Sequence, residues 1–287
     1  MRIWPLSPTL IGFTAILMWA TLALLTTWSG DLPPFQLTAL AFSIAFVASL
    51  LLDWFQGHSP LRAWRLPWPV WLLGVGGLFG YHFCYFLALQ HAPVAQASLI
   101  AYLWPLLIVL LAARLPGERL GWRQGLGAIA GFGGAALLVA AEASLRLEAR
   151  YALGYLAALA CAVIWSSYSV LSRRYGEIPT ASVGRFCGVT ALLAWLCHGV
   201  WEVTVWPVGG AWLAVLALGL GPVGLAFFTW DYGVKRGNLK LLGTLAYGAP
   251  LLSTLLLVIA GLAAPTWRLA IACAAIVGGA ALAAGDR

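Results

Sequence analysis

The chain is a succession of long apolar runs separated by short segments that contain proline, glycine and charged residues. An α-helix crosses a hydrocarbon core about 30 Å thick with about 20 apolar residues. Runs of this length predict ten membrane spans, near residues 9–28, 34–53, 69–89, 92–113, 121–142, 152–173, 181–201, 211–234, 238–260 and 266–284. The pattern therefore predicts an all-α integral membrane protein.

The chain resembles itself when it is shifted by 145 residues. The shift aligns Tyr102 with Tyr247 and continues through Pro34 and Pro179, Pro105 and Pro250, Trp122-Arg123 and Trp267-Arg268, and Gly133-Gly134 and Gly278-Gly279. A shift of 146 residues, one more than this offset, pairs Trp19 with Trp165. Chance explains aligned Ala and Leu between apolar sequences, but not a fixed offset across Tyr, Pro, Trp and Arg. We therefore expect two five-helix repeats, residues 1–148 and 149–287, in one membrane unit.

Each predicted repeat holds an odd number of spans, so the second repeat must enter the membrane from the opposite side. Inverted repeats are a common construction of secondary transporters, whose substrate site lies near the bilayer midplane between the repeats. The repeat therefore predicts a central cavity that both halves line.

Composition and charge agree with a membrane fold. Hydrophobic residues make up 62% of the 287 residues, and charged residues only 9%. With the N-terminus in the cytoplasm, most of the 16 Lys and Arg residues fall inside, and only Arg146, Arg150 and Arg268 fall outside. This bias predicts a multi-pass membrane protein with both termini cytoplasmic. The formal charge of +7 is then expected to face anionic lipids, not nucleic acid.

The sequence shows no set of residues typical of a metal or cofactor site. Its five cysteines lie in apolar stretches without Cys-x-x-Cys spacing, which suggests neither disulfides nor zinc. The glycine-rich segment from Gly125 to Gly134 lacks the preceding strand that a dinucleotide loop needs, so we interpret it as helix packing. We expect no cofactor, no metal and no catalytic residue.

Polar and aromatic side chains gather at one predicted depth of the bilayer. Tyr81, His82 and Tyr85 share one helix face, because residues four apart lie above one another. Polar groups in hydrocarbon are costly unless they are paired or face a wet cavity. The residues predicted to bind substrate are Trp19, Tyr81, His82, Tyr85, Tyr102, Trp104, Trp165, Ser166 and Tyr247. The alternative is that these residues form a buried cluster that fastens helices together.

Two further pairs of residues are singled out by their positions. Pro105 and Pro250 occupy matching repeat positions and are predicted to kink their helices at a gate. No acidic residue falls at the midplane, so a carboxylate proton relay is not indicated. Arg185 and Asp231 project near the cytoplasmic ends of the seventh and eighth spans, where we expect them to pair.

Several segments resemble the drug/metabolite transporter superfamily. They are Ala88-Leu89-Gln90-His91-Ala92-Pro93-Val94, Tyr102-Leu103-Trp104-Pro105 and Gly117-Glu118-Arg119, together with the tandem halves. The chain most closely resembles the EamA-type exporters and, among them, the bacterial aromatic amino acid exporters. The resemblance implies export of amino acids or similar metabolites through a central cavity lined by the aromatic residues and His82 named above. The second half has Ala226, Phe227 and Trp230 where the first has Tyr81, His82 and Tyr85, so the two walls are expected to differ chemically.

The leading hypothesis is a secondary transporter that exports aromatic and other neutral amino acids by alternating access, as a monomer or weak oligomer. Its partners are then small amino acid substrates and membrane lipids. One alternative is a broad exporter of hydrophobic or cationic compounds, which the missing midplane carboxylate disfavours. A remote alternative is an intramembrane serine hydrolase, with His82 activating Ser98 or Ser167.

Overall fold

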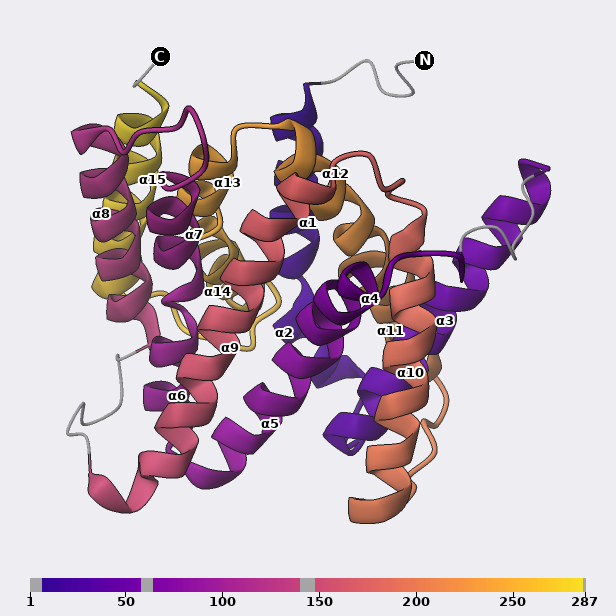
Figure 1. Ribbon diagram of the computed structural model, residues 1–287. Helices are drawn as coiled ribbons and strands as arrows, with labels where there is room; N and C mark the ends of the chain where they lie inside the picture. The colour runs from indigo at the N-terminus through magenta and orange to yellow at the C-terminus, as the bar shows by residue number, and fades with distance from the viewer. Residues whose placement is uncertain (1–6, 58–63, 140–147, 286–287) are drawn as a thin grey trace.

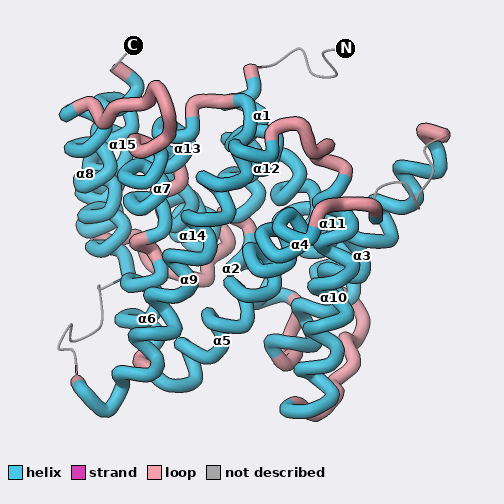
Figure 2. The backbone as a smooth tube through the Cα atoms, viewed as in Figure 1, coloured by secondary structure: helices cyan, strands magenta, loops and turns pink. Residues whose placement is uncertain are grey.

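The computed structural model describes residues 7–57, 64–139 and 148–285, and these residues are helices joined by short loops, with no strand among them (Figures 1 and 2). Within that part of the chain, 9 helical stretches are long and apolar enough to cross a membrane. They correspond to nine of the predicted spans. The predicted fifth span is α8 (Trp122–Val139), which packs along α15 (Trp267–Ala284). The all-α membrane fold is confirmed, while the count of ten spans stays a prediction.

Many spans are divided into two helices. In the first half the elements are α1 (Pro8–Trp19), α2 (Leu22–Trp28), α3 (Pro34–Phe55), α4 (Trp68–Val75), η2 (Gly76–Gly80), α5 (Tyr81–His91), α6 (Val94–Ala101), α7 (Trp104–Ala112) and α8. In the second half they are η3 (Ala149–Tyr151), α9 (Ala152–Leu171), η4 (Ser172–Tyr175), α10 (Ser182–Trp201), α11 (Ala211–Leu220), η5 (Gly221–Leu225), α12 (Ala226–Arg236), α13 (Leu239–Leu245), α14 (Gly248–Ile259) and α15.

The breaks within these spans occur at equivalent positions of the two halves, 145 residues apart. Both η2 and η5 are short π-helical turns, and their bounds differ by the 145 residues that align the two halves. Tyr102 lies in the break between α6 and α7, and its counterpart Tyr247 lies in the break between α13 and α14. Pro105 and Pro250 lie in the first turn after these breaks. Broken helices free backbone groups at mid-membrane depth, which proteins tolerate where those groups are buried or line a cavity.

Small residues bring helices of the two halves into backbone contact. A Cβ atom added to Gly233 of α12 would lie 2.5 Å from the Cα of Gly12 in α1. A Cβ added to Gly127 of α8 would lie 2.4 Å from the carbonyl oxygen of Gly279 in α15. Without a hydrophobic driving force between helices in lipid, such close packing is a main source of helix association.

We call the side where α1 begins and α15 ends the terminal face, and the other side the opposite face (Figure 1). At the opposite face the Glu202 carboxylate, just after α10, accepts hydrogen bonds from the first N–H groups of α3. These bonds measure 2.8 Å from Phe35 and 2.9 Å from Gln36. His198 contacts the same carboxylate through Nδ1 at 2.9 Å. Glu202 thus ties the second predicted span to the seventh.

The predicted pairing of Arg185 with Asp231 is wrong. Arg185 of α10 forms a buried ion pair with Asp53 of α3. Asp231 instead contacts Lys235, one turn further along α12, at 2.9 Å, and accepts a hydrogen bond from Thr180 at 2.8 Å. The sequence predicts the approximate depth of Arg185 in its span, but not which helix lies beside it. Because α10 packs against α3, Arg185 pairs with an acidic residue of α3.

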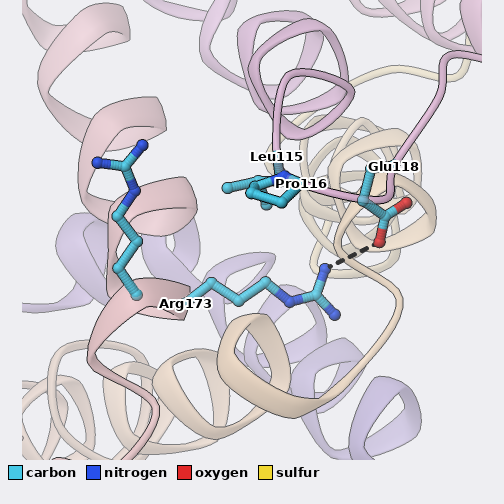
Figure 3. A pocket seen from close by; sticks show the side chains of 5 residues that line it. Leu115, Pro116, Glu118 and Arg173 are labelled. Carbon is cyan, nitrogen blue, oxygen red and sulfur yellow. Dashed lines mark ion pairs between the residues drawn. The ribbon is translucent and has the colours of Figure 1, made fainter.

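A pocket of about 220 Å³ opens at the terminal face, between the loop after α7 and the end of α9 (Figure 3). Its lining consists of Leu115, Pro116, Glu118, Arg173 and Arg174. The pocket therefore lies where loops of the two halves meet, away from the predicted midplane site.

Candidate functional site

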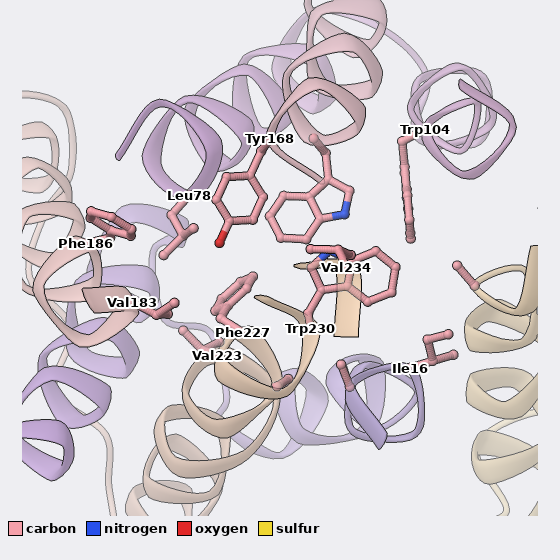
Figure 4. Packing of buried hydrophobic residues seen from close by; sticks show 14 of the residues in the cluster. Ile16, Leu78, Trp104, Tyr168, Val183, Phe186, Val223, Phe227, Trp230 and Val234 are labelled. Carbon is pink, nitrogen blue, oxygen red and sulfur yellow. The ribbon is translucent and has the colours of Figure 1, made fainter. Parts of the chain in front are cut away.

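Five aromatic side chains from four spans pack together, and we call them the tryptophan cluster: Trp19, Trp104, Trp165, Phe227 and Trp230. Trp19, at the end of α1, is in contact with all four others, at ring-centroid distances from 5.0 Å to Trp230 to 6.2 Å to Trp104. Most of these ring pairs are tilted or edge-to-face, the geometry that the aromatic quadrupole favours. Figure 4 shows Trp104, Phe227 and Trp230 within the surrounding core.

The indole N–H groups of this cluster find partners inside the protein. Trp19 donates from Nε1 to the carbonyl oxygen of Pro222 in η5 at 3.0 Å. Trp230 donates from Nε1 to Ser169 Oγ at 3.0 Å, and Ser169 in turn donates to the carbonyl oxygen of Trp165 at 2.8 Å. The π-helical turn of the second half thus supplies an acceptor to the first half. This bond joins the two halves through α1 and η5.

A second group lies beside the cluster on α5. Tyr81 and Tyr85 stack with centroids 6.0 Å apart, and Tyr81 also reaches Trp165 at 5.8 Å. The Tyr85 hydroxyl lies 3.4 Å from Ser98 Oγ of α6. Tyr102, in the break after α6, lies one helical turn beyond Ser98 and donates its backbone N–H to the Ser98 carbonyl oxygen at 2.8 Å. We call Tyr81, Tyr85 and Tyr102 the tyrosine wall.

His82 lies between the tyrosine wall and the cluster. Its ring contacts Phe42 of α3 at a centroid distance of 5.3 Å and Phe227 at 6.4 Å. Its Nδ1 is 2.7 Å from the carbonyl oxygen of Leu78 in η2, so in the neutral ring Nδ1 carries the proton. That tautomer leaves Nε2 as an acceptor within the aromatic site.

Exposure divides the predicted residues into two sets. Trp19, Tyr81, His82, Tyr85 and Tyr102 are partly exposed although they belong to mid-span elements. Trp104 and Trp165 are buried, with 6% and 4% of their surface exposed. The first set therefore retains exposed aromatic and polar surface. The two buried tryptophans pack against Trp19 of that set.

Two predicted residues lie apart from this site. Ser166 is buried, and its hydroxyl donates to the carbonyl oxygen of Val163 one turn earlier in α9. Tyr247 is fully buried in another cluster, where its ring meets Phe132 of α8 at 6.2 Å and covers Gly131. The structure thus brings together seven of the nine residues predicted to bind substrate, those other than Ser166 and Tyr247.

The site also contains residues outside the set predicted to bind substrate. Trp230 and Phe227 of α12 are central to the tryptophan cluster, and Phe42 of α3 stacks on Phe227 at 5.6 Å. The repeat offset carried a signal for two of them, because it aligns Trp230 with Tyr85 and Phe227 with His82. No comparable signal marks Phe42, which the repeat offset aligns with the non-aromatic Cys187.

His82 and Ser98, which the hydrolase alternative would pair, each contact another group. His82 Nδ1 is directed to Leu78, and Ser98 lies next to Tyr85, so the described contacts do not form the serine–histidine pair that a hydrolase needs. Within the described residues, no group of three or more His, Cys, Asp or Glu side chains is placed to hold a metal ion. Aromatic faces with a few hydroxyls and an imidazole acceptor suit a small amphipathic ligand.

Comparison with known proteins places this architecture among membrane transporters. A family model described as the EamA-like transporter family matches residues 6–140 and again residues 152–285. The aromatic amino acid exporter YddG of Ancylobacter novellus is 59% identical over 278 residues, which cover 96% of each protein. A protein of Streptantibioticus cattleyicolor named "Probable terminal-alkyne amino-acid exporter" is 30% identical over 233 residues, or 76% of each. A crystal structure that is 58% identical over 96% of each chain superposes with a TM-score of 0.91.

Proposed function

The chain belongs to the EamA-like transporter family, and on that premise we propose that it exports aromatic and other neutral amino acids by alternating access. The observation that carries this proposal is the partly exposed tyrosine wall beside the tryptophan cluster. It gives a ligand both π-faces and hydroxyl groups at mid-span depth. The relatives named as amino acid exporters agree with the substrate class.

We assign the parts of an amino acid to the parts of the site by their chemistry. The side chain of an aromatic substrate would lie against Trp19 and the stacked rings of Tyr81 and Tyr85, where offset or edge-to-face contacts stabilise it. Its carboxylate needs donors, which the hydroxyls of Tyr85, Ser98 and Tyr102 supply. Its ammonium group needs acceptors or a π-face, and His82 Nε2 and the aromatic rings meet that need.

A broad exporter of cations is less well supported by these contacts. Cationic substrates usually call for a buried carboxylate. The buried acids near the terminal face, Asp53 and Asp231, already contact Arg185 and Lys235. The acidic groups of those two spans are therefore engaged in structural pairs and not directed at the aromatic site.

The broken helices support alternating access as the mechanism. In inverted-repeat transporters the halves rock around a fixed site, and discontinuous helices hold that site. Here the breaks at η2, η5, Tyr102 and Tyr247 lie at matching positions of the two halves. We propose that Pro105 and Pro250, in the first turns after two of these breaks, keep those helices bent as the halves move.

We further propose that the terminal face is cytoplasmic and that the membrane is the bacterial inner membrane. The terminal face holds Glu118 with its cationic partners Arg173 and Lys240, and also Lys235 and Arg236 at the end of α12. This concentration of basic residues on one side is what the positive-inside rule associates with the cytoplasm.

The test is uptake of labelled phenylalanine, tryptophan, methionine and threonine into liposomes that contain the purified protein. We expect saturable uptake, and at least a tenfold loss in Trp104→Ala, whose ring lies edge-on to Trp19, Trp165 and Trp230. The matched control is Trp54→Ala near the end of α3, a tryptophan that is 78% exposed. Liposomes with wild-type protein that take up none of the four amino acids would refute the substrate assignment.

A further inference from the structure

Glu118 joins the two halves at the terminal face. It lies in the loop between α7 and α8 of the first half, and its two carboxylate oxygens contact different cations of the second half. One oxygen is 2.9 Å from Lys240 Nζ in the first turn of α13. The other is 3.5 Å from Arg173 in η4, and Figure 3 shows this second contact. One carboxylate thus bridges two segments that lie 67 residues apart in the chain.

The loop holds this carboxylate in a defined position. Gly117 has a φ of 79°, a left-handed conformation that side chains other than glycine rarely adopt. The following N–H, of Glu118, donates to the carbonyl oxygen of Leu115 at 3.0 Å and closes the turn. Lys240 also donates to the carbonyl oxygen of Arg119 at 2.8 Å, and its side chain is only 11% exposed. The Glu118–Lys240 contact is therefore a partly buried contact between a fixed turn and a helix start.

The same contacts extend to the neighbouring segments. Arg173 donates to the carbonyl oxygen of Gly237, at the end of α12, at 2.5 Å. The next residue, Asn238, donates its N–H to Thr9 Oγ1 of α1 at 2.9 Å. The Gly12–Gly233 contact lies one turn deeper between α1 and α12. Glu118 is therefore connected through Arg173 and Gly237 to the contact between Asn238 and α1.

The repeat-equivalent positions of Glu118 and Lys240 cannot form the same ion pair. At the repeat offset Glu118 aligns with Ala263, and Lys240 aligns with Ala95. An alanine can form neither side of such an ion pair, so the equivalent positions at the opposite face lack it. The two faces thus differ in charge at these repeat-equivalent positions.

We propose that Glu118 is the latch of the gate at the terminal face, holding the halves closed there through Lys240 and Arg173 and releasing them when that face opens. This proposal rests on the proposed alternating-access function. Each exposed or half-exposed ion pair contributes about 0.2 to 1 kcal/mol. Two such contacts on one carboxylate are strong enough to shift a gating equilibrium and weak enough to break in every cycle.

The first test measures the gate without any substrate. Thr9→Cys and Asn238→Cys are combined, because these residues touch across the closed face, and the rate of disulfide formation under mild oxidation is measured. We expect Glu118→Gln in that background to slow cross-linking roughly two- to thirtyfold, because it removes two pairs that each contribute a factor of roughly 1.4 to 5. The matched control is Glu177→Gln, an exposed carboxylate of the η4–α10 loop, which should leave the rate unchanged. Equal rates in the Glu118→Gln variant and its parent would overturn the latch.

The second test asks whether the latch opens during transport. Glu118→Cys with Lys240→Cys, joined by a reducible bis-thiosulfonate cross-linker that spans the length of the lost Glu–Lys contact, should stop uptake, and a reducing agent should restore it, while the same reagent should leave each single variant active. Uptake that continues in the cross-linked protein, or failure of the two cysteines to cross-link, contradicts the proposal. If the wild type moves none of the amino acids, the substrate assignment fails, yet the cross-linking rates still decide the latch.

Discussion

The contact between Gly12 and Gly233 yields a prediction that depends on backbone geometry alone. In Gly233→Ala the new Cβ would lie 2.5 Å from Gly12 Cα and 3.0 Å from Gly12 N. Favourable carbon contacts are about 3.5 to 4.0 Å, so the two helices must separate by about 1 Å. No side-chain rotation relieves the clash, because the atoms that it meets belong to the backbone. The close packing of α1 on α12 would be lost along the interface between the halves.

The size of the effect follows from two opposing terms. Overpacking a fitted interface costs about 1 to 3 kcal/mol. Alanine in place of glycine within a helix gains back up to about 1 kcal/mol. We therefore expect a net loss of about 1 to 2 kcal/mol, or a fall of about 2 to 8 °C in melting temperature. Opening this interface also weakens the terminal gate, so the variant should lose transport beyond its loss of folded protein.

Thermal unfolding of purified protein in detergent, followed by tryptophan fluorescence, measures this difference. Gly133→Ala is the matched control, since Gly133 is an exposed glycine within α8 and a Cβ there meets nothing within 4 Å. It should unfold at the wild-type temperature or slightly above. Equal melting temperatures for Gly233→Ala and Gly133→Ala would refute the account of the α1–α12 interface.

Three further changes test other contacts. Arg185→Ala leaves the buried Asp53 carboxylate without this partner and should lower the free energy of unfolding by about 3 to 5 kcal/mol; a folded variant with wild-type resistance to denaturant would contradict this. Glu202→Gln removes the charged acceptor at the start of α3 and should cost about 0.5 to 2 kcal/mol, measured as a lower melting temperature. Trp19→Phe keeps a ring in the cluster but leaves the Pro222 carbonyl without its donor, at a cost of about 1 to 3 kcal/mol. Uptake by Trp19→Phe should fall, and unchanged uptake and stability would exclude a role for that bond.

Hydropathy and the internal repeat together account for much of the fold. Nine predicted spans coincide with apolar helices of membrane length in the described part of the chain. The alignment of Tyr102 with Tyr247 also matches the structure, because each lies in a helix break. Both results follow from patterns along the chain. The length of each apolar run predicts a span, and the fixed repeat offset predicts the equivalent positions of the two breaks.

What could not be predicted is the rotation of each helix and the identity of its neighbours. Tyr247 has the depth expected of a site residue, but it faces Phe132 and Gly131 of α8. Arg185 likewise pairs with Asp53 because α10 packs on α3, a neighbour that span order does not reveal. The residues Phe227 and Trp230 lie in the site because α12 crosses α1 at Gly12 and Gly233, a backbone contact that the sequence does not specify.

The most direct test of the account is phenylalanine transport by liposomes that contain wild-type protein, Trp104→Ala or Trp54→Ala. The tryptophan cluster and the tyrosine wall are proposed as the substrate site, so wild type and Trp54→Ala should transport at the same rate per folded protein. Trp104→Ala should be at least tenfold slower. Equal transport by all three proteins would contradict the proposed site, and no transport by any of them would contradict the proposed substrate.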